Sequence, residues 1–228
     1  MRLPMSSGLA GFENDSVLEQ SPSRSGHFIK LVIGVIVVAL ALNLFWPEFS
    51  VRHAEGVLVP NAPYQGPPTI ANVWAMDEFT FTPLAEIDME ARVLHKKRYR
   101  FGKTSELSQF DLALGWGAMS DQYIFDRLSF SQRGRWYFFQ SKEQHMPLAP
   151  SVALNSSSNW HTIASSDEVQ DAIANLKVGH IIHLKGQLVN VNTNDGWRWQ
   201  SSMSRSDRGD GSCELIWVES VEVINAGQ

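Results

Sequence analysis

An unbroken apolar run from Leu31 to Trp46, followed directly by Pro47, constrains this chain more than any other feature. Counted from Phe28, a helix over the run is about 28 Å long, close to the roughly 30 Å of a bilayer's hydrocarbon core. Lys30 lies within one turn of the start of that helix, where its long side chain reaches the headgroups. The run therefore predicts one transmembrane helix, which Pro47 ends.

A cleavable signal peptide is the main alternative to a membrane anchor. Ala39-Leu40-Ala41 fits the small-x-small pattern of a cleavage site, so cleavage would follow Ala41. This tripeptide lies inside the apolar run, however, and Trp46 still belongs to the run. A buried core helix is the weaker alternative because the run has no polar face. The anchor is the preferred interpretation, and cleavage at Ala41 stays open.

The charges that flank the run favour a cytoplasmic N-terminus. Arg24 and Lys30 precede the apolar stretch and Arg52 follows it, and basic residues are enriched on the cytoplasmic side of a membrane helix. In a Gram-negative bacterium this orientation places the helix in the inner membrane and the C-terminal domain in the periplasm. Cys213 is the only cysteine, so no intrachain disulfide forms and the redox compartment is left open.

The chain divides into four predicted regions. They are a disordered tail over residues 1–27, the transmembrane helix over 28–46, a Pro- and Gly-containing stalk over 47–77, and a soluble domain over 78–228. A loop packed onto the domain is the alternative for Val57 to Val59. The net charge of −5, with both signs interspersed, argues against nucleic acid as a partner. It also argues against a domain that lies flat on anionic lipid.

Alternating apolar and charged residues predict an antiparallel sheet in the soluble domain. From Ala85 to Val93 the alternation is strict, so one face of this strand is buried. A second strand over residues 180–191 changes phase around Gly186, as a strand does at a bulge that bends it. Asn194-Asp195-Gly196 predicts a hairpin turn, and apolar positions between residues 215 and 223 predict the last strand.

Helical signals lie between these strands. Leu107, Phe110 and Leu114 fall on one helical face, and glycine follows them at position 115. A second short helix is capped by Ser120-Asp121, and the sequence from Ser165 to Glu168 forms a capping box before a third. We therefore predict an α+β fold with a curled antiparallel sheet, barrel-like at its C-terminal end, and two or three short helices.

The connection from Ser201 to Glu214 is the best candidate for a functional loop, because it concentrates hydroxyl, charged and thiol groups between two strands. Cys213 as nucleophile, His161 as base and an aspartate such as Asp207 to orient the base would form a hydrolytic triad. Cys213 is predicted to lie on the same strand face as the apolar residues Leu215 and Trp217, two and four positions further on. A buried, inert thiol is therefore the preferred interpretation.

Arg205 and Arg208 of the same loop are candidates for an anion site, with structural ion pairs as the default interpretation. The acidic residues around them lack the spacing of a calcium loop, so we predict no metal site and no cofactor. Trp197 and Trp199 alternate on one strand face and are candidates for a glycan-stacking platform. Aromatic residues in this pattern are more often part of a core.

Four segments carry a resemblance to a known family. They are Asp111-Leu-Ala-Leu-Gly-Trp-Gly117, Met119-Ser-Asp121, Trp197-Arg-Trp-Gln-Ser-Ser202 and Ser212-Cys-Glu-Leu-Ile-Trp-Val218. With these segments the chain, over about residues 78–224, resembles a family of small proteobacterial single-span membrane proteins to which no activity is assigned. The resemblance implies a bacterial, membrane-anchored, envelope-facing setting, and it supplies no functional residue.

The sequence thus predicts a single-pass membrane protein with an envelope-facing domain. A non-enzymatic module that binds or assembles with another envelope protein is the preferred function. The alternative is a membrane-tethered hydrolase that uses the loop from Ser201 to Glu214 with His161. The oligomeric state stays open.

Overall fold

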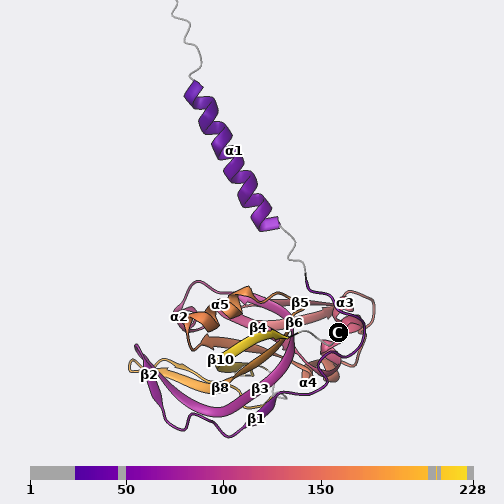
Figure 1. The fold of residues 1–228 in the computed structure, drawn as a ribbon, viewed down its shortest axis with the longest axis vertical. Helices are drawn as coiled ribbons and strands as arrows, with labels where there is room; N and C mark the ends of the chain where they lie inside the picture. Colours follow the sequence, from indigo (N-terminus) through magenta and orange to yellow (C-terminus); the bar gives the residue numbers. More distant parts are fainter. Residues whose placement is uncertain (1–23, 46–49, 205–208, 210–211, 225–228) are drawn as a thin grey trace, which may run out of the picture. The chain divides into compact units, whose positions relative to one another are not determined.

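A computed structural model of the chain describes residues 24–45, 50–204, 209 and 212–224 (Figure 1). The chain forms two compact units, Met1–Pro47 and Glu48–Gln228. The predicted tail lies outside the described residues up to position 23. Residues 24–27, which were also predicted as tail, belong to a helix.

The first unit contains helix α1, Arg24–Phe45. Every side chain from Phe28 to Val38 that the structure describes is exposed, and Phe28 and Leu31 are each about two-thirds exposed, at 67% and 66%. Among the residues described, no helix has both the length and the apolarity that crossing a membrane requires.

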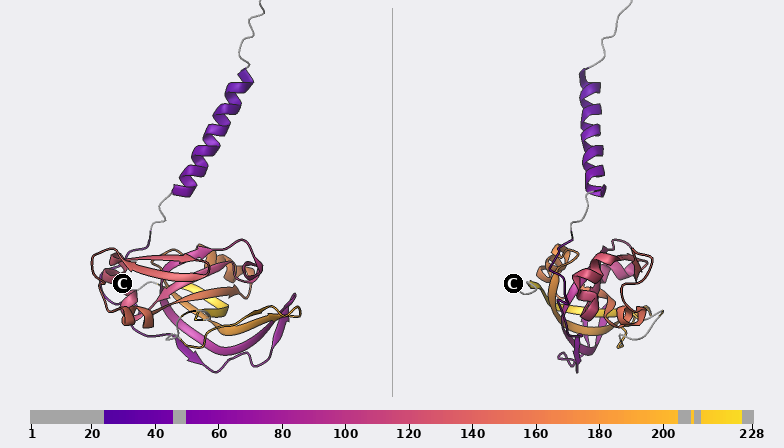
Figure 2. Two further views of the ribbon diagram at one scale, coloured as in Figure 1. Left: turned by 180° about the vertical axis from the view of Figure 1, so that it is seen from behind. Right: turned by 90° about the vertical axis from the view of Figure 1, so that its right-hand side faces the viewer.

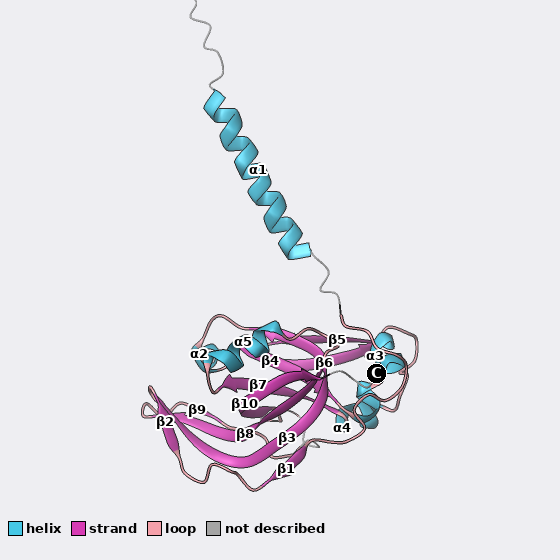
Figure 3. Cartoon of the chain, viewed as in Figure 1, coloured by secondary structure: helices cyan, strands magenta, loops and turns pink. Residues whose placement is uncertain are grey.

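The second unit is an α+β domain with one large sheet, as the sequence predicted. Its strands are β1 (Tyr64–Gly66), β2 (Trp74–Met76), β3 (Phe79–Arg98), β4 (Phe110–Gly115), β5 (Leu128–Arg133), β6 (Trp136–Ser141), β7 (Ser157–Ala164), β8 (Ile181–Thr193), β9 (Arg198–Trp199) and β10 (Glu214–Ile224). Its helices are α2 (Lys103–Leu107), the 3₁₀ turn η1 (Gly117–Ser120), α3 (Gln122–Arg127), α4 (Pro150–Asn155) and α5 (Asp167–Asn175). Figure 3 shows α3 and α4 on one flank of the domain, and α2 and α5 on the other.

Five strands of the large sheet close into a barrel, in the order β3-β4-β7-β10-β8, and β8 pairs back with β3. The 20-residue strand β3 makes closure possible, because residues 79–92 pair with β8 and residues 92–98 pair with β4. Its curvature is plain in Figure 1 and in the left view of Figure 2. The structure corrects two details of the predicted sheet. The barrel includes β3 and β4 as well as the C-terminal strands, and β7 and β10 run parallel.

The barrel interior is the main hydrophobic core. The alternate residues of β3 from Ala85 to Val93 are at most 2% exposed, so the predicted burial of this face is confirmed. Ile173 and Leu176, in and just after α5, pack against the same core. Complete burial of a side chain such as Ile173 contributes about 1.5–3 kcal/mol.

The apolar residues of β8 change parity as the sequence indicated, but the predicted bulge at Gly186 is wrong. β8 alternates regularly, and the register shifts lie in its partner strands, between Pro83 and Ala85 on β3 and between Val218 and Ser220 on β10. Leu188 belongs to the interior core, whereas the next residue, Val189, belongs to a second cluster outside the barrel. Gly186 has a different role, because β10 approaches its Cα so closely that a Cβ would lie 2.1 Å from Trp217 O.

The predicted helix through Leu107, Phe110 and Leu114 is wrong. Residues 110–115 form the strand β4, and only residues 103–107 are helical, as α2. All six residues of β4 are buried, because the barrel interior covers one face and residues between β4 and β7 cover the other. A strand buried on both faces has no alternation, so its apolar run also fits a helical period.

The other two predicted helices are present and have polar caps. Asp121 Oδ1 accepts a hydrogen bond of 2.7 Å from Tyr123 N at the start of α3. Ser166 Oγ accepts one of 3.3 Å from Val169 N at the start of α5. The cap of α5 thus lies one residue after the predicted Ser165.

The predicted turn at Asn194-Asp195-Gly196 joins β8 to β9. Asp195 Oδ1 accepts hydrogen bonds from the Thr193 hydroxyl and from Trp197 N, and Asp195 Oδ2 lies 3.0 Å from Lys103 Nζ. These contacts, the Thr193 hydrogen bond first, lower the pKa of Asp195 from 3.8 to about 2.

Asp195 is therefore expected to contribute to the acid sensitivity of the domain. Its pKa is lower in the folded state than in the unfolded one, so its stabilising effect is complete above about pH 4 and is lost as pH falls towards about 2. In Asp195→Asn this part of the pH dependence should disappear, as measured by urea unfolding across that range. Parallel pH profiles for the variant and the parent chain would contradict the assignment.

The stalk prediction is wrong for the described residues, because the chain from residue 50 onward packs on the domain. Val51 N donates to Val178 O at 2.8 Å, and Gly117 N donates to Val59 O at 2.7 Å. Val59 is buried, and its N–H and that of Leu58 both donate to Ser120 Oγ. Further on, β1 and β2 pair with β3. We call residues 50–76 the strap.

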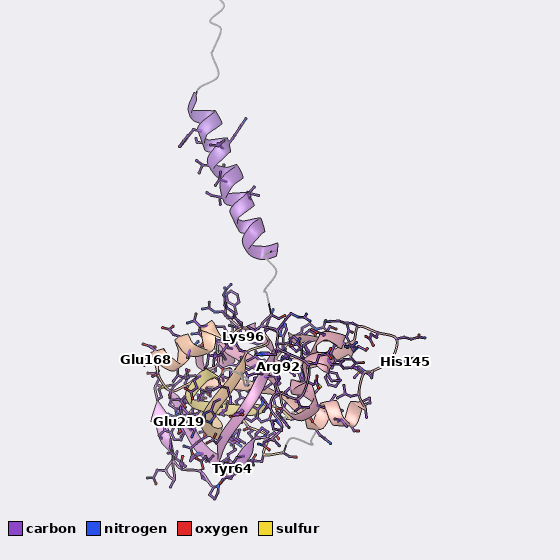
Figure 4. All side chains as sticks on the ribbon, turned by 45° about the vertical axis from the view of Figure 1, so that its right-hand side comes forward. Tyr64, Arg92, Lys96, His145, Glu168 and Glu219 are labelled. Carbon is purple, nitrogen blue, oxygen red and sulfur yellow. The ribbon has the colours of Figure 1, made fainter. Side chains whose placement is uncertain are left out.

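Arg92 joins the strap to the barrel from a fully buried position on β3 (Figure 4). Its guanidinium donates to Ser120 O at 3.1 Å and to Gln122 Oε1 at 2.6 Å, and it lies 3.5 Å from Val51 O. It also stacks on the Phe125 ring at 3.7 Å. Burial lowers the pKa of Arg92 to about 10, so the side chain stays charged at neutral pH.

Candidate functional site

The outer face of β4 and β7 carries the main polar cluster of the domain. On β4, Leu112 and Leu114 point into the barrel core. Because side chains alternate along a strand, Asp111 and Ala113 point outward. Asp111 is therefore on the outer face, and the β4–β7 register places it opposite His161. The same register places Ala113 opposite Asn159.

Asp111, Arg135 and His161 form a buried polar cluster on this face. Asp111 Oδ1 accepts a 2.6 Å hydrogen bond from Arg135 Nη1 and lies 3.0 Å from His161 Nδ1. Arg135 comes from the turn between β5 and β6, where its φ of 70° is left-handed, and its guanidinium also donates to Ser108 O at 2.9 Å. Such charge-assisted bonds are strong because burial excludes competing water.

Aromatic rings cover the cluster. The Trp199 ring centroid lies 4.9 Å from that of His161, and the Arg135 guanidinium lies 4.1 Å from the Tyr99 ring centroid. Burial, and then the negative charge of Asp111, raise the pKa of Tyr99. The side chains of Asp111 and His161 are 0% and 5% exposed, so the cluster is largely closed to solvent.

Cys213 lies next to this cluster and contacts Asn159. Its Sγ is 3.7 Å from Asn159 Nδ2 and 3.8 Å from Arg135 O. The polar neighbour of His161 is Asp111, which the sequence-based triad did not include. Asp111 approaches His161 Nδ1 to 3.0 Å, but the contact does not have the geometry of a hydrogen bond. Cys213 lies level with Asn159, two positions before His161 on β7.

A crevice opens beside Cys213, between β6 and β7. Its volume is about 170 Å³. One wall is aromatic and the other is polar, with Trp136, Tyr137, Phe139, Ser158, Asn159 and Cys213 as the main lining residues. The Oγ of Ser158 is buried without a hydrogen-bond partner among the described residues, and burial raises the pKa of Tyr137. The crevice therefore offers aromatic surface together with polar groups.

The remaining predicted site residues lie elsewhere. Arg205, Asp207 and Arg208 lie outside the described residues. Trp197 and Trp199 are half-buried and contact each other with ring centroids 6.2 Å apart, in the cluster outside the barrel. They are therefore packed in a core more than they are presented as a flat platform.

The sequence interpretation missed Asp111, Arg135 and Asn159. A signal for Asp111 was present, because it is the one charged residue in the otherwise apolar segment from Phe110 to Gly115. The helical interpretation of that segment hid the signal, since a charge at one helix edge is unremarkable. No comparable signal marks Arg135, which reaches the cluster only through the β5–β6 hairpin.

Comparisons with known proteins add no assignment. No protein-family model, no curated protein and no solved structure matches the chain. Within the described part of the domain, no group of three or more His, Cys, Asp or Glu side chains is arranged to hold a metal ion.

Proposed function

We propose that the protein is a membrane-anchored binding module. In this proposal α1 crosses the bacterial inner membrane with its N-terminus in the cytoplasm, and the barrel presents the crevice beside Cys213 to another envelope component. The anchor is supported by the apolar run from Leu31 to Trp46 and by the exposure of every described side chain from Phe28 to Val38.

The barrel topology supports a binding role for the β4–β7 side. The strand order, the parallel β7–β10 pair and the position of α5 between β7 and β8 are those of barrels that bind oligonucleotides or oligosaccharides. Such barrels bind ligands on the outer face of their second and third strands. Here these strands are β4 and β7, and the β5–β6 hairpin lies over part of that face, where Arg135 reaches Asp111 (Figure 3).

The crevice is the observation that carries the proposal. Arg135 of the hairpin covers Asp111 and Trp199 covers His161, but the space between β6 and β7 remains open. It combines the Trp136 ring with the polar residues at the start of β7. Concave surfaces that join aromatic walls to a few polar groups are typical ligand sites. The net charge and the sequence give no support to nucleic acid as this ligand.

A membrane-tethered hydrolase is the second candidate, and the Asp111–His161 pair is the observation that favours it. A general base needs a partner that orients it, and Asp111 lies 3.0 Å from His161 Nδ1. It also needs a nucleophile within reach, and the contacts described for the Cys213 sulfur are to Asn159 Nδ2 and Arg135 O. We therefore place binding first.

The proposal predicts position-specific crosslinking from the crevice. A photo-crosslinking amino acid in place of Trp136, which is 38% exposed, should give a discrete adduct in cells. The same amino acid in place of Val223, which is 49% exposed on β10 and does not line the crevice, should give none. Adducts are read by immunoblot and identified by mass spectrometry.

Two results would contradict this proposal. Equal adducts from positions 136 and 223 would show only general proximity to other proteins. Hydrolysis of an ester or peptide substrate by the purified chain, lost in both His161→Ala and Cys213→Ala, would make the hydrolase the better interpretation.

A further inference from the structure

A cluster of basic residues surrounds an exposed aromatic ring where β3 leads into α2. We call residues 95–103, from the last residues of β3 to the first residue of α2, the basic loop. Its charged and aromatic members are His95, Lys96, Lys97, Arg98, Tyr99, Arg100, Phe101 and Lys103. The chain as a whole has a net charge of −5, but five of these nine positions are Lys or Arg.

The outer charges of the basic loop are available to a partner. Lys97 and Arg100 are exposed, and their side chains take part in no hydrogen bond or ion pair within the described residues. Lys103 differs, because it lies 3.0 Å from Asp195 and 3.7 Å from Glu78. The uncompensated positive charge is therefore concentrated between positions 97 and 100.

Phe101 is the most exposed large apolar side chain in the described residues, at 91%. Full exposure of a phenyl ring costs free energy that burial in an apolar environment would recover. A ring held out among Lys and Arg is typical of segments that rest at a membrane interface, where the ring enters the acyl boundary and the cations contact headgroups.

One end of the basic loop, at Lys96, lies near the point where the chain enters the domain. Lys96 Nζ donates to Ala174 O and Leu176 O, and Val51 N donates to Val178 O two residues further on. Lys96 is also labelled in Figure 4, on the same strand as Arg92. Residues 46–50 are all that separates Val51 from α1, and a chain of this length reaches at most about 20 Å.

We infer that the basic loop docks on the anionic headgroups of the bilayer that holds α1, with Phe101 inserted at the interface. This inference rests on the proposed membrane anchor. Negative lipid attracts basic residues near its surface with about 1 kcal/mol each, which corresponds to about a fivefold change in partition.

The local cluster of positive charge at the basic loop changes what the net charge of the chain predicts about binding to anionic lipid. The overall value of −5 argues against a domain that lies flat on anionic lipid, but screening confines each charge to about 8–10 Å at physiological salt. The acidic residues elsewhere on the domain therefore have little effect at positions 97–101. Contact is confined to one edge of the domain.

Full-length protein in lipid nanodiscs tests the inference. Phe101→Cys in a Cys213→Ser background carries an environment-sensitive NBD label, and Val223→Cys in the same background is the control site. The discs contain phosphatidylcholine alone or phosphatidylcholine mixed with phosphatidylglycerol. We expect blue-shifted, stronger NBD emission from position 101 only in the discs with phosphatidylglycerol, and its loss at about 1 M salt, where the Debye length is about 3 Å.

Matched charge variants distinguish binding of lipid by the basic loop from a general attraction between the whole domain and anionic lipid. Lys97→Gln with Arg100→Gln should lower the ratio of docked to free loop about 25-fold, the product of two fivefold effects. Lys142→Gln with Arg198→Gln removes the same charge from other exposed positions and should leave the NBD signal unchanged.

Three outcomes would overturn the inference in distinguishable ways. If the chain does not co-elute with nanodiscs, the proposed anchor is wrong and this inference fails with it. A chain that co-elutes but gives the same NBD emission in both lipid mixtures removes this inference alone. This inference alone is also overturned if the NBD label does not respond to phosphatidylglycerol but does respond, in phosphatidylcholine discs, to an anionic polymer or an acidic protein.

Discussion

Replacement of Gly186 by alanine is expected to lower the free energy of unfolding of the domain by about 3 kcal/mol or more. The new Cβ would lie 2.1 Å from Trp217 O and 3.1 Å from Val218 Cα, and both belong to the backbone of β10. A backbone clash is relieved only by moving a strand, and overpacking of this kind costs about 1–3 kcal/mol, occasionally more. Urea unfolding followed by tryptophan emission measures the loss.

Gly66→Ala is the matched control for Gly186→Ala. Its added Cβ would lie 2.4 Å from the hydroxyl of Tyr64, which is an exposed side chain that can rotate away. We expect this variant to stay within about 1 kcal/mol of the parent chain. Equal destabilisation by the two substitutions would show that the β8–β10 contact at Gly186 is less close than the structure has it.

Substitution of Arg92 by methionine is expected to destabilise the domain by about 2–5 kcal/mol, because two buried neutral acceptors lose their charged donor at about 1–3 kcal/mol each. Methionine keeps much of the volume but gives no hydrogen bond to Ser120 O or Gln122 Oε1, so both oxygens stay buried without this donor. Because Arg92 also reaches Val51, the strap should become more susceptible to protease. Unfolding curves and limited proteolysis measure the two effects.

Arg98→Met is the control for Arg92→Met, because Arg98 lies on the same strand but is exposed. It should change the free energy of unfolding by less than about 0.5 kcal/mol. Arg92→Lys should be intermediate, since lysine retains the charge but lacks the planar fork of donors. Full stability in Arg92→Met would mean that the strap binds the barrel without this network.

The helices and strands that could be predicted from the sequence are those with one face in the core and the other in solvent. The alternation from Ala85 to Val93 and the amphipathic pattern of α5 both record a boundary between core and solvent. β4 has no such boundary, because the barrel and the insertion between β4 and β7 bury both of its faces. Its apolar run therefore carries no direct sign of strand or helix.

The strap was mistaken for a stalk for a related reason. Its prolines predict an extended backbone correctly, but an extended backbone is compatible with solvent and with packing on a domain. The deciding contacts, such as Val59 with Gly117 and Val51 with Val178, join residues more than 50 positions apart. Periodicity within a short window contains no information about such pairs.

The candidate site was predictable only in part. His161 was recognised as a candidate base, but its partner Asp111 was assigned to a helix, and Arg135 reaches both from a separate hairpin. The register of β4 with β7 creates the Asp111–His161 pair, and that register is a property of the closed sheet. A cluster assembled by sheet closure becomes visible only when the sheet is known.

The place of β10 after the other four barrel strands in the chain sets the order in which the domain can form. β10 is the strand that bridges β7 and β8, so the barrel stays open until β10 itself has been synthesised. Contacts between distant residues also form slowly. Until then the edges of β7 and β8 lack their partner and are open to association with other chains. A chain that is cut short before residue 214 should therefore depend on chaperones and be degraded quickly, even though most of its core residues are present.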